Sequence, residues 1–447
     1  MARTVDMTSG KPLKLIVRFA YPAAAGSLLQ QLYSLCDLII LGRSGGVAAL
    51  AAVSSSGWLD YMCLGTVINL TMGFGIRMSH FFGAGDKKGL KKTVAQSVVL
   101  SVFLSLALLI LSQALLRPCL TLLNTPGETF ALTEIYLRII FGGIPLSMAY
   151  NLAAACLRAA GDSRTPLYAV IAASVCNLCL DLLFVAALRF GPAGAAAATV
   201  VSQGISAAVC LRAWMGVPGM RVSRADMKKD PGEMKKLLSL GLPSAFEVWV
   251  ISFGGLIVNS AVNARGYIFM AGYNAPGRLQ ALMESVGNAV GGAVGTFTGQ
   301  NYGAGRMDRV REGVGKSALT SVGLALAMAA VMLAAGKPLI RFFMVDAETL
   351  VEEVVTVGYR FVIVMSAALV SLYLLFVYRS ALKGLGKVRA SFASSVIEFA
   401  MRVSCVFLLP GLMGEWGLYI AEVMAWFGAF VLLYLAYRKN IKRMMAP

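Results

Sequence analysis

Long apolar stretches alternate with short polar segments along almost the whole chain, from Leu13 to Tyr437. A helix needs roughly 20 apolar residues to cross the hydrocarbon core of a bilayer. Dividing the sequence at charged residues and at glycine and proline breaks leaves stretches of that kind, which predicts an all-α polytopic membrane protein surrounded by lipid. Twelve transmembrane helices are expected, at 13–41, 50–76, 93–116, 132–156, 166–188, 193–214, 238–263, 276–300, 315–335, 355–380, 391–410 and 416–437.

The composition agrees with this pattern, because 58% of the 447 residues are hydrophobic and only 14% are charged. A soluble domain carries about 25% charged residues, so a water-soluble protein is excluded. The formal net charge of +18 comes from 40 basic and 22 acidic residues, but 30 of the basic residues fall at the two ends and in the loops after even-numbered spans. By the positive-inside rule both termini are then cytoplasmic, and nucleic acid is not an expected partner.

The two halves of the sequence contain matching segments at a nearly constant offset. His80–Gly85 (HFFGAG) matches Gln300–Gly305 (QNYGAG) 220 residues later, and Leu157–Gly161 matches Leu382–Gly386. These matches indicate a duplication of six spans, and since six is even, both copies enter the membrane from the same side. We expect parallel repeats with a central cavity near the middle of the bilayer, a plan typical of transporters. The predicted parts are an N-lobe (1–211), a cytoplasmic linker (212–236) and a C-lobe (237–447).

Polar side chains recur inside the predicted spans of the N-lobe at helical spacing. Residues three, four or seven apart share a helix face, and an ionisable group within the membrane marks function by default. Neither Asp37 nor Asp181 has a lysine or arginine at comparable depth, so these two carboxylates are expected to bind a proton or a metal cation. The sets that share a face are Gln30, Tyr33 and Asp37 on the first span, Asn177 and Asp181 on the fifth, and Thr199 and Gln203 on the sixth.

The C-lobe contains further acids within its predicted spans. Arg402 follows Glu398 by four residues, which predicts an ion pair along one helix face, and Arg402 is the only basic residue expected deep in the membrane. Glu247 lies on the seventh span and Glu284 on the eighth. The candidates for lining a substrate cleft are Gln30, Tyr33, Gln203, Glu247, Glu284, Glu398 and Arg402.

Three acidic residues and one proline in the spans have a structural interpretation as well as a functional one. Asp60, Glu284 and Glu422 lie toward the outer ends of their helices, where a charged side chain can reach the interface at low cost. Pro22 lies fifteen residues before Asp37 and removes one backbone hydrogen bond from its helix. Pro22 is therefore either a hinge or a static kink in the first helix.

Several motifs resemble the multidrug and toxic compound extrusion (MATE) family, over essentially the whole chain. They are the duplicated six-span plan, the two glycine turns that end the second and eighth spans, and the segments Tyr33–Asp37 and Leu157–Asp162. The resemblance implies two six-helix lobes arranged in a V and related by a pseudo-two-fold axis. His80, where the family commonly has a glutamine, is a mild departure. Glu247 is a candidate for the C-lobe carboxylate that another branch of the family uses on its seventh span.

In the DinF-like branch of prokaryotic members, one cation site combines an aspartate of the first span, an asparagine and an aspartate of the fifth, and a threonine of the sixth. This resemblance implies coupling to H⁺, or to Na⁺, with no other metal and no cofactor. It also implies that Pro22 is the proline at which the first helix bends. The residues that match the cation site are Asp37, Asn177, Asp181 and Thr199.

The expected function is secondary active efflux of cationic amphipathic drugs or metabolites, exchanged for H⁺ or Na⁺ by alternating access. We expect a monomer in the plasma membrane of a bacterium or archaeon. The alternative within the same superfamily is a flippase for lipid-linked saccharides, whose cleft should hold several cationic side chains, and a channel is a further class. An enzyme is not expected, because the chain has one histidine, His80, and no HExxH pattern.

Overall fold

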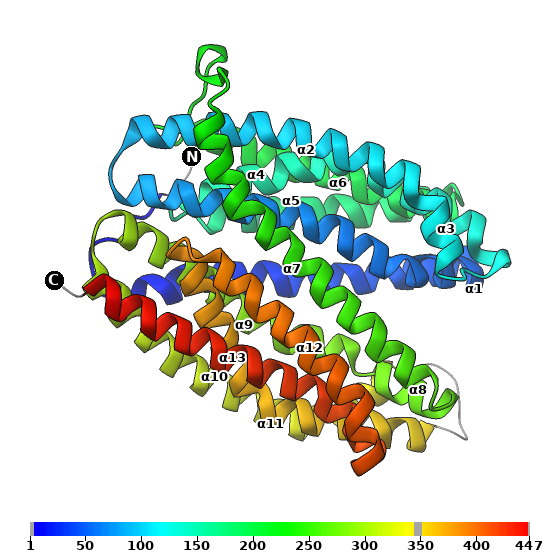
Figure 1. Ribbon diagram of the computed structural model, residues 1–447. Helices are drawn as coiled ribbons and strands as arrows, with labels where there is room; N and C mark the ends of the chain where they lie inside the picture. Colours follow the sequence, from blue (N-terminus) through cyan, green and yellow to red (C-terminus); the bar gives the residue numbers. More distant parts are fainter. Residues whose placement is uncertain (1–3, 344–350, 446–447) are drawn as a thin grey trace. The chain divides into compact units, whose positions relative to one another are not determined.

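The computed structural model describes residues 4–343 and 351–445, and helices make up most of both ranges (Figure 1). No strand occurs in these ranges, so the predicted all-α polytopic fold is confirmed. In chain order the elements are α1 (Pro12–Gly83), α2 (Lys87–Leu122), α3 (Gly127–Gly142), α4 (Ile144–Ala159), α5 (Arg164–Asp181), the π-helix η1 (Leu182–Ala187), α6 (Gly191–Trp214), the 3₁₀-helix η2 (Arg224–Met227), α7 (Pro231–Asn263), α8 (Tyr267–Asn274), α9 (Gly277–Gly303), α10 (Met307–Phe343), α11 (Val351–Gly384), α12 (Val388–Met413) and α13 (Trp416–Met445).

Each predicted span coincides with a helix or with part of one. The first two spans are both in α1, and they separate at Gly46, where φ is 77° and the backbone is not helical. The fourth span is the pair α3 and α4, bent by 45°. Within the described ranges, ten helices are long and apolar enough to cross a membrane, or eleven with this pair as one span. The predicted span at 276–300 coincides with α9, which has 27 residues but is rich in glycine, serine and threonine.

The chain divides into two compact units. The first contains Met1–Thr8 and Tyr21–Val248, and the second contains Ser9–Ala20 and Trp249–Pro447. The chain therefore passes from one unit to the other inside α1, between Ala20 and Tyr21, and again inside α7. The two units are defined by contacts within the structure, whereas the predicted lobes 1–211 and 237–447 are defined by the sequence repeat. The units therefore do not test the lobe bounds, which stay a prediction.

The matching segments of the two halves form matching turns. Gly85 and Gly305 have φ values of 70° and 72°, and Gly161 and Gly386 have values of 82° and 72°. In the first pair, the amide of Asp86 donates to the carbonyl of Phe81 at 3.1 Å, and the amide of Arg306 donates to that of Asn301 at 2.8 Å. The equivalent bonds after the second pair run from Asp162 to Leu157 and from Lys387 to Leu382. All four are Schellman turns, which require a left-handed residue and so favour glycine.

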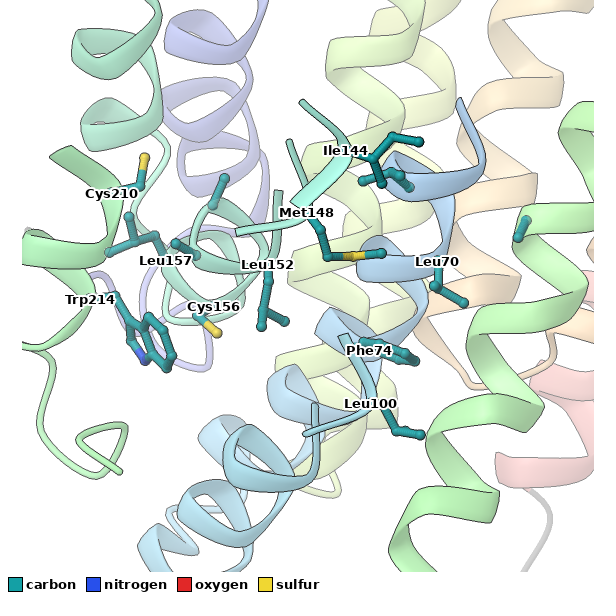
Figure 2. Close-up of a cluster of buried hydrophobic side chains, with 14 of the residues drawn as sticks. Leu70, Phe74, Leu100, Ile144, Met148, Leu152, Cys156, Leu157, Cys210 and Trp214 are labelled. Atoms are coloured by element: carbon teal, nitrogen blue, oxygen red, sulfur yellow. The ribbon is translucent and has the colours of Figure 1, made fainter. Parts of the chain in front are cut away.

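The core of the first unit is built around α4 (Figure 2). Apolar residues at a spacing of four cover one face of this helix and are at most 4% exposed: Ile144, Met148, Leu152 and Cys156. They belong to one cluster with Phe74 of α1, Leu100 of α2 and Trp214 of α6. Because α6 packs against both α4 and α5, this core fixes the two helices that carry the predicted fifth- and sixth-span site residues.

The predicted linker, 212–236, is bound to the first unit by charged contacts. Lys91 of α2 forms an ion pair with Asp226 of η2 at 2.8 Å, and Lys92 pairs with Asp230. The hydrogen bond from Lys91, together with those from Ser223, lowers the pKa of Asp226 to about 2. Because this pKa lies below the usual value of about 3.9, the contact contributes stability above that value and loses it as the pH falls toward 2.

Candidate functional site

The predicted cation site lies in the first unit, where α5 changes its backbone geometry. Asn177 and Asp181 are 2% and 1% exposed, and Asp181 is the last residue of α5 before the π-helix Leu182–Ala187. Short π-helical turns are rare and occur frequently at functional sites. Here the wider turn begins directly after the carboxylate that the sequence singled out.

Asp37 of α1 and Asp181 of α5 come together. Their carboxyl groups lie within hydrogen-bonding range of each other, although 144 residues separate them in the sequence. Tyr33 lies one turn before Asp37, and its hydroxyl interacts electrostatically with both Asp37 and Asp181. The polar face predicted for the first span and the one predicted for the fifth span therefore contact each other.

The polar atoms of this pair are buried without donors from the protein. In the described ranges, Asp37 Oδ1, both carboxylate oxygens of Asp181 and Asn177 Nδ2 have no hydrogen-bond partner. A buried acceptor that lacks a donor costs about 1–3 kcal/mol, so the site fits a ligand that supplies one. A single proton shared by the two carboxyl groups would supply it.

No basic side chain of the described residues neutralises Asp37 or Asp181. None of the ion pairs formed by the lysines and arginines of residues 4–343 and 351–445 includes Asp37 or Asp181. Groups of three or more His, Cys, Asp and Glu side chains that could hold a metal ion are also absent from these ranges. The two carboxyl groups thus face each other without a cationic partner among the described residues.

Two neighbouring residues were not predicted as part of the site. Asp60 has a buried Oδ1 without a partner in the described chain, and its charge acts on both Tyr33 and Tyr136. Tyr136 also faces Asp37 and Asp181. The outer-end position of Asp60 in its span favoured a structural role, whereas the fold places this carboxyl group near Tyr33 and Tyr136.

The remaining predicted residues of the first unit differ in their surroundings. The side-chain carbonyl of Gln203 accepts a hydrogen bond from the hydroxyl of Ser147 in α4. Thr199 is half-buried on the same helix, Gln30 is exposed, and Pro22 is buried inside α1. Glu247 is 3% exposed, and it belongs to the first unit because the second unit begins at Trp249.

The C-lobe acids form a different kind of site. Glu398 and Arg402 make the predicted ion pair, at 3.1 Å. Glu398 has a second cationic partner that the sequence did not predict, because Arg379, near the end of α11, is 9% exposed and pairs with Glu398 at 2.8 Å. Glu284 accepts a hydrogen bond from Gln280 at 2.8 Å. In contrast to the aspartates of the first unit, Glu398 is fully matched by cations.

Comparison with known proteins identifies the family. The model of the MatE family matches residues 22–183 and 243–408. The probable multidrug resistance protein YpnP of Bacillus subtilis is 34% identical over 312 residues, which cover 69% of each chain. The multidrug export protein MepA of Staphylococcus aureus is 22% identical over 94% of this chain and 93% of its own.

Solved structures share the fold. The outward-facing conformation of a multidrug resistance MATE family transporter of the MOP superfamily superposes with a TM-score of 0.92, at 22% identity, over 100% of both chains. A crystal structure of MATE in the bent conformation gives a TM-score of 0.89 over 99% of both chains. With two family segments that match in the two halves and a relative at 34% identity, this multi-pass membrane protein belongs to the MatE family of multidrug efflux transporters.

Proposed function

We propose that the protein exports cationic amphipathic compounds in exchange for protons, and that Asp37 and Asp181 are the proton site. The observation that carries this proposal is the contact between the buried carboxyl group of Asp181 and the half-buried one of Asp37, which no lysine or arginine of the described chain neutralises. Na⁺ in place of H⁺ is the alternative ion, with Asn177 and Thr199 as the additional oxygen donors.

The physical basis is repulsion between like charges. Two carboxylates in contact cannot both stay ionised at low cost, so they titrate as a pair and take up one proton between them. An ionised pair attracts a cationic substrate, and a protonated pair does not. Proton binding from the outside therefore favours substrate release, and proton loss to the cytoplasm restores the negative charge.

The available driving force matches this task. One elementary charge that crosses a potential of about 100 mV gains roughly 2.3 kcal/mol, which corresponds to about a fifty-fold concentration ratio. When one proton exchanges for one monovalent cation, no net charge moves. Only the chemical proton gradient then drives export of that substrate.

The first helix has features that suit a conformational change. Pro22 lies inside α1 and removes a backbone hydrogen bond there. Two residues earlier, between Ala20 and Tyr21, the chain passes from the second unit to the first. A change in the shape of α1 at this point would move Asp37 relative to residues 9–20, which supports Pro22 as a hinge.

Substitution of Asp37 by asparagine tests the proposal. In proteoliposomes that contain the full chain, we expect Asp37→Asn to reduce efflux of a lipophilic cation such as tetraphenylphosphonium to the level of empty vesicles. Asp308→Asn is the matched control, because Asp308 is 66% exposed at the start of α10. Efflux by Asp37→Asn at the rate of the unmodified protein would exclude this site, and separate dissipation of the H⁺ and Na⁺ gradients identifies the ion.

The flippase alternative has less support. A flippase for lipid-linked saccharides needs cationic side chains to bind a pyrophosphate group. Among the described residues of the second unit, three arginines are buried. Arg379 and Arg402 are each bound to glutamates, and Arg309 donates to Asn301 and to the carbonyl of Gly10. They are therefore not available for a phosphate as they stand.

A further inference from the structure

The second unit contains buried charges that the proposed transport cycle does not use. They come from α9, α11, α12 and α13, and each lies in the interior of the unit or half-buried at its edge. We call them the α12 cluster, because α12 supplies its centre. Its members are Glu284, Arg379, Glu398, Arg402 and Glu422.

Two of the three glutamates are matched by guanidinium groups. Glu398 accepts from Arg379 on Oε2 at 2.8 Å and from Arg402 on Oε1 at 3.1 Å. Glu422 accepts from Arg402 Nη2 at 2.6 Å and from the indole of Trp426. Both carboxylates therefore accept hydrogen bonds from donors with positive or partial positive charge.

Glu284 has no such partner in the described chain. Its one hydrogen bond comes from the neutral amide of Gln280, four residues earlier on α9. The charges that face it are those of Arg402, Glu398 and Glu422. The nearby Tyr373 of α11 donates its hydroxyl hydrogen to the carbonyl of Met283 at 2.8 Å, and Tyr273 of α8 faces Glu422 and Arg402.

The α12 cluster contains more acidic than basic side chains. Two arginines face three glutamates, so the α12 cluster would carry one net negative charge with every group ionised. A net charge buried away from water costs several kcal/mol, and such a group binds a proton in preference to staying charged. We propose that the α12 cluster binds one exchangeable proton, held by Glu284, as a second proton site distinct from Asp37 and Asp181.

The same geometry disfavours a metal ion here. Arg402 Nη2 bridges Glu398 and Glu422 at 3.1 and 2.6 Å, so a positive charge already occupies the space between the carboxylates. Gly254 of α7 leaves room for this guanidinium, since a Cβ atom there would lie 3.1 Å from Arg402 Nη1. A proton needs no coordination sphere, and the half-buried Glu284 is the member at which it can exchange.

Charge counting makes a sharp experimental prediction. In purified full-length protein at pH 7, difference infrared spectroscopy reports the carbonyl stretch of protonated carboxyl groups. Glu284→Gln should remove one such band relative to the unmodified protein. Glu422→Gln should remove the same band, because two arginines would then face two glutamates and Glu284 would ionise.

Two further variants separate this inference from the proposed function. Glu415→Gln, at an exposed ion pair with Arg360 at 3.8 Å, should leave the band unchanged. The double variant Asp37→Asn, Asp181→Asn should also keep it, whatever its transport activity. A spectrum in which Glu284→Gln and Glu422→Gln remove only ionised-carboxylate bands would overturn the proposal, and either variant is sufficient if the other does not fold.

Discussion

Asp181 and Glu398 are both buried carboxyl groups, but their neighbours are of opposite kinds. Asp181 lies against another acid, Asp37, and lacks a cation. Glu398 is bound by Arg379 and Arg402 and has both oxygens occupied. A carboxyl group of the first kind suits the proposed exchange of a proton, whereas one of the second kind is bound by cations and contributes to structure.

Loss of the central cation should therefore destabilise the second unit. Arg402→Met leaves Glu422 and one oxygen of Glu398 buried without a guanidinium, and removal of one partner of a buried ion pair costs about 3–5 kcal/mol. We expect a clearly lower thermal unfolding midpoint for this variant in detergent. Arg360→Met, at an exposed pair, should change the midpoint little, since such pairs contribute about 0–1 kcal/mol. Equal midpoints for the two variants would contradict this view of the α12 cluster.

The sequence predicted interactions between residues that lie on the same helix. The spacing of four between Glu398 and Arg402 predicted their ion pair, and face-sharing predicted the sets around Asp37 and Asp181. The pair between Arg379 and Glu398 joins two helices, and nothing in the spacing indicates which of several lysines and arginines beside α11 turns inward. Asp60 was missed for the same reason, because its neighbour Tyr136 lies on a different helix.

At the scale of helices and turns, the glycine turns are the most constrained parts of the chain. Gly161 has a φ of 82°, and a Cβ atom there would lie 2.1 Å from the carbonyl oxygen of Val5. The amide of Val5 in turn donates to Ala160 at 3.1 Å. This turn therefore binds the N-terminal segment as well as ending α4.

Alanine substitutions separate these two roles. Gly85→Ala should cost about 1–2 kcal/mol, because its φ of 70° is left-handed but its Cβ position is open. Gly161→Ala should cost more, since Val5 must also move. Amide hydrogen exchange should show faster exchange at Val5 in Gly161→Ala than in Gly85→Ala. Unchanged exchange there would mean that the turn does not hold the segment.

The helices that form the predicted spans were predicted in order but not in length. The prediction for α2 was 93–116, whereas the helix runs from Lys87 to Leu122. Its first turns are basic and polar, and the side chain of Asp86 caps them by accepting from the amide of Gly89 at 2.9 Å. Hydropathy reports the part of a helix that lipid covers and misses turns that continue into water.

At the scale of the whole molecule, the distribution of basic residues predicts orientation. A fluorescent protein that folds only in the cytoplasm should be fluorescent when fused after residue 445. Alkaline phosphatase, which is active only outside the cytoplasm, should be active when fused after Arg189, in the loop between the fifth and sixth spans. The reverse pattern of activities would invert the topology.

Sequence alone was sufficient at this scale for the family and the duplicated plan. Apolar stretches, glycine turns and charge asymmetry recur along the whole chain, so many independent positions support each prediction. The units defined by contacts could not be predicted, because their bounds fall inside α1 and α7, where the sequence continues without a break.

The equal glycine turns mark equivalent positions in the two halves of a duplicated chain. Gly386 follows Gly161 by 225 residues, and Arg402 follows Asn177 by the same number. At these equivalent positions the first half has an amide beside a titratable acid, whereas the second half has a guanidinium bound to glutamates. The two halves therefore share a backbone plan but differ in the charge that they place on it.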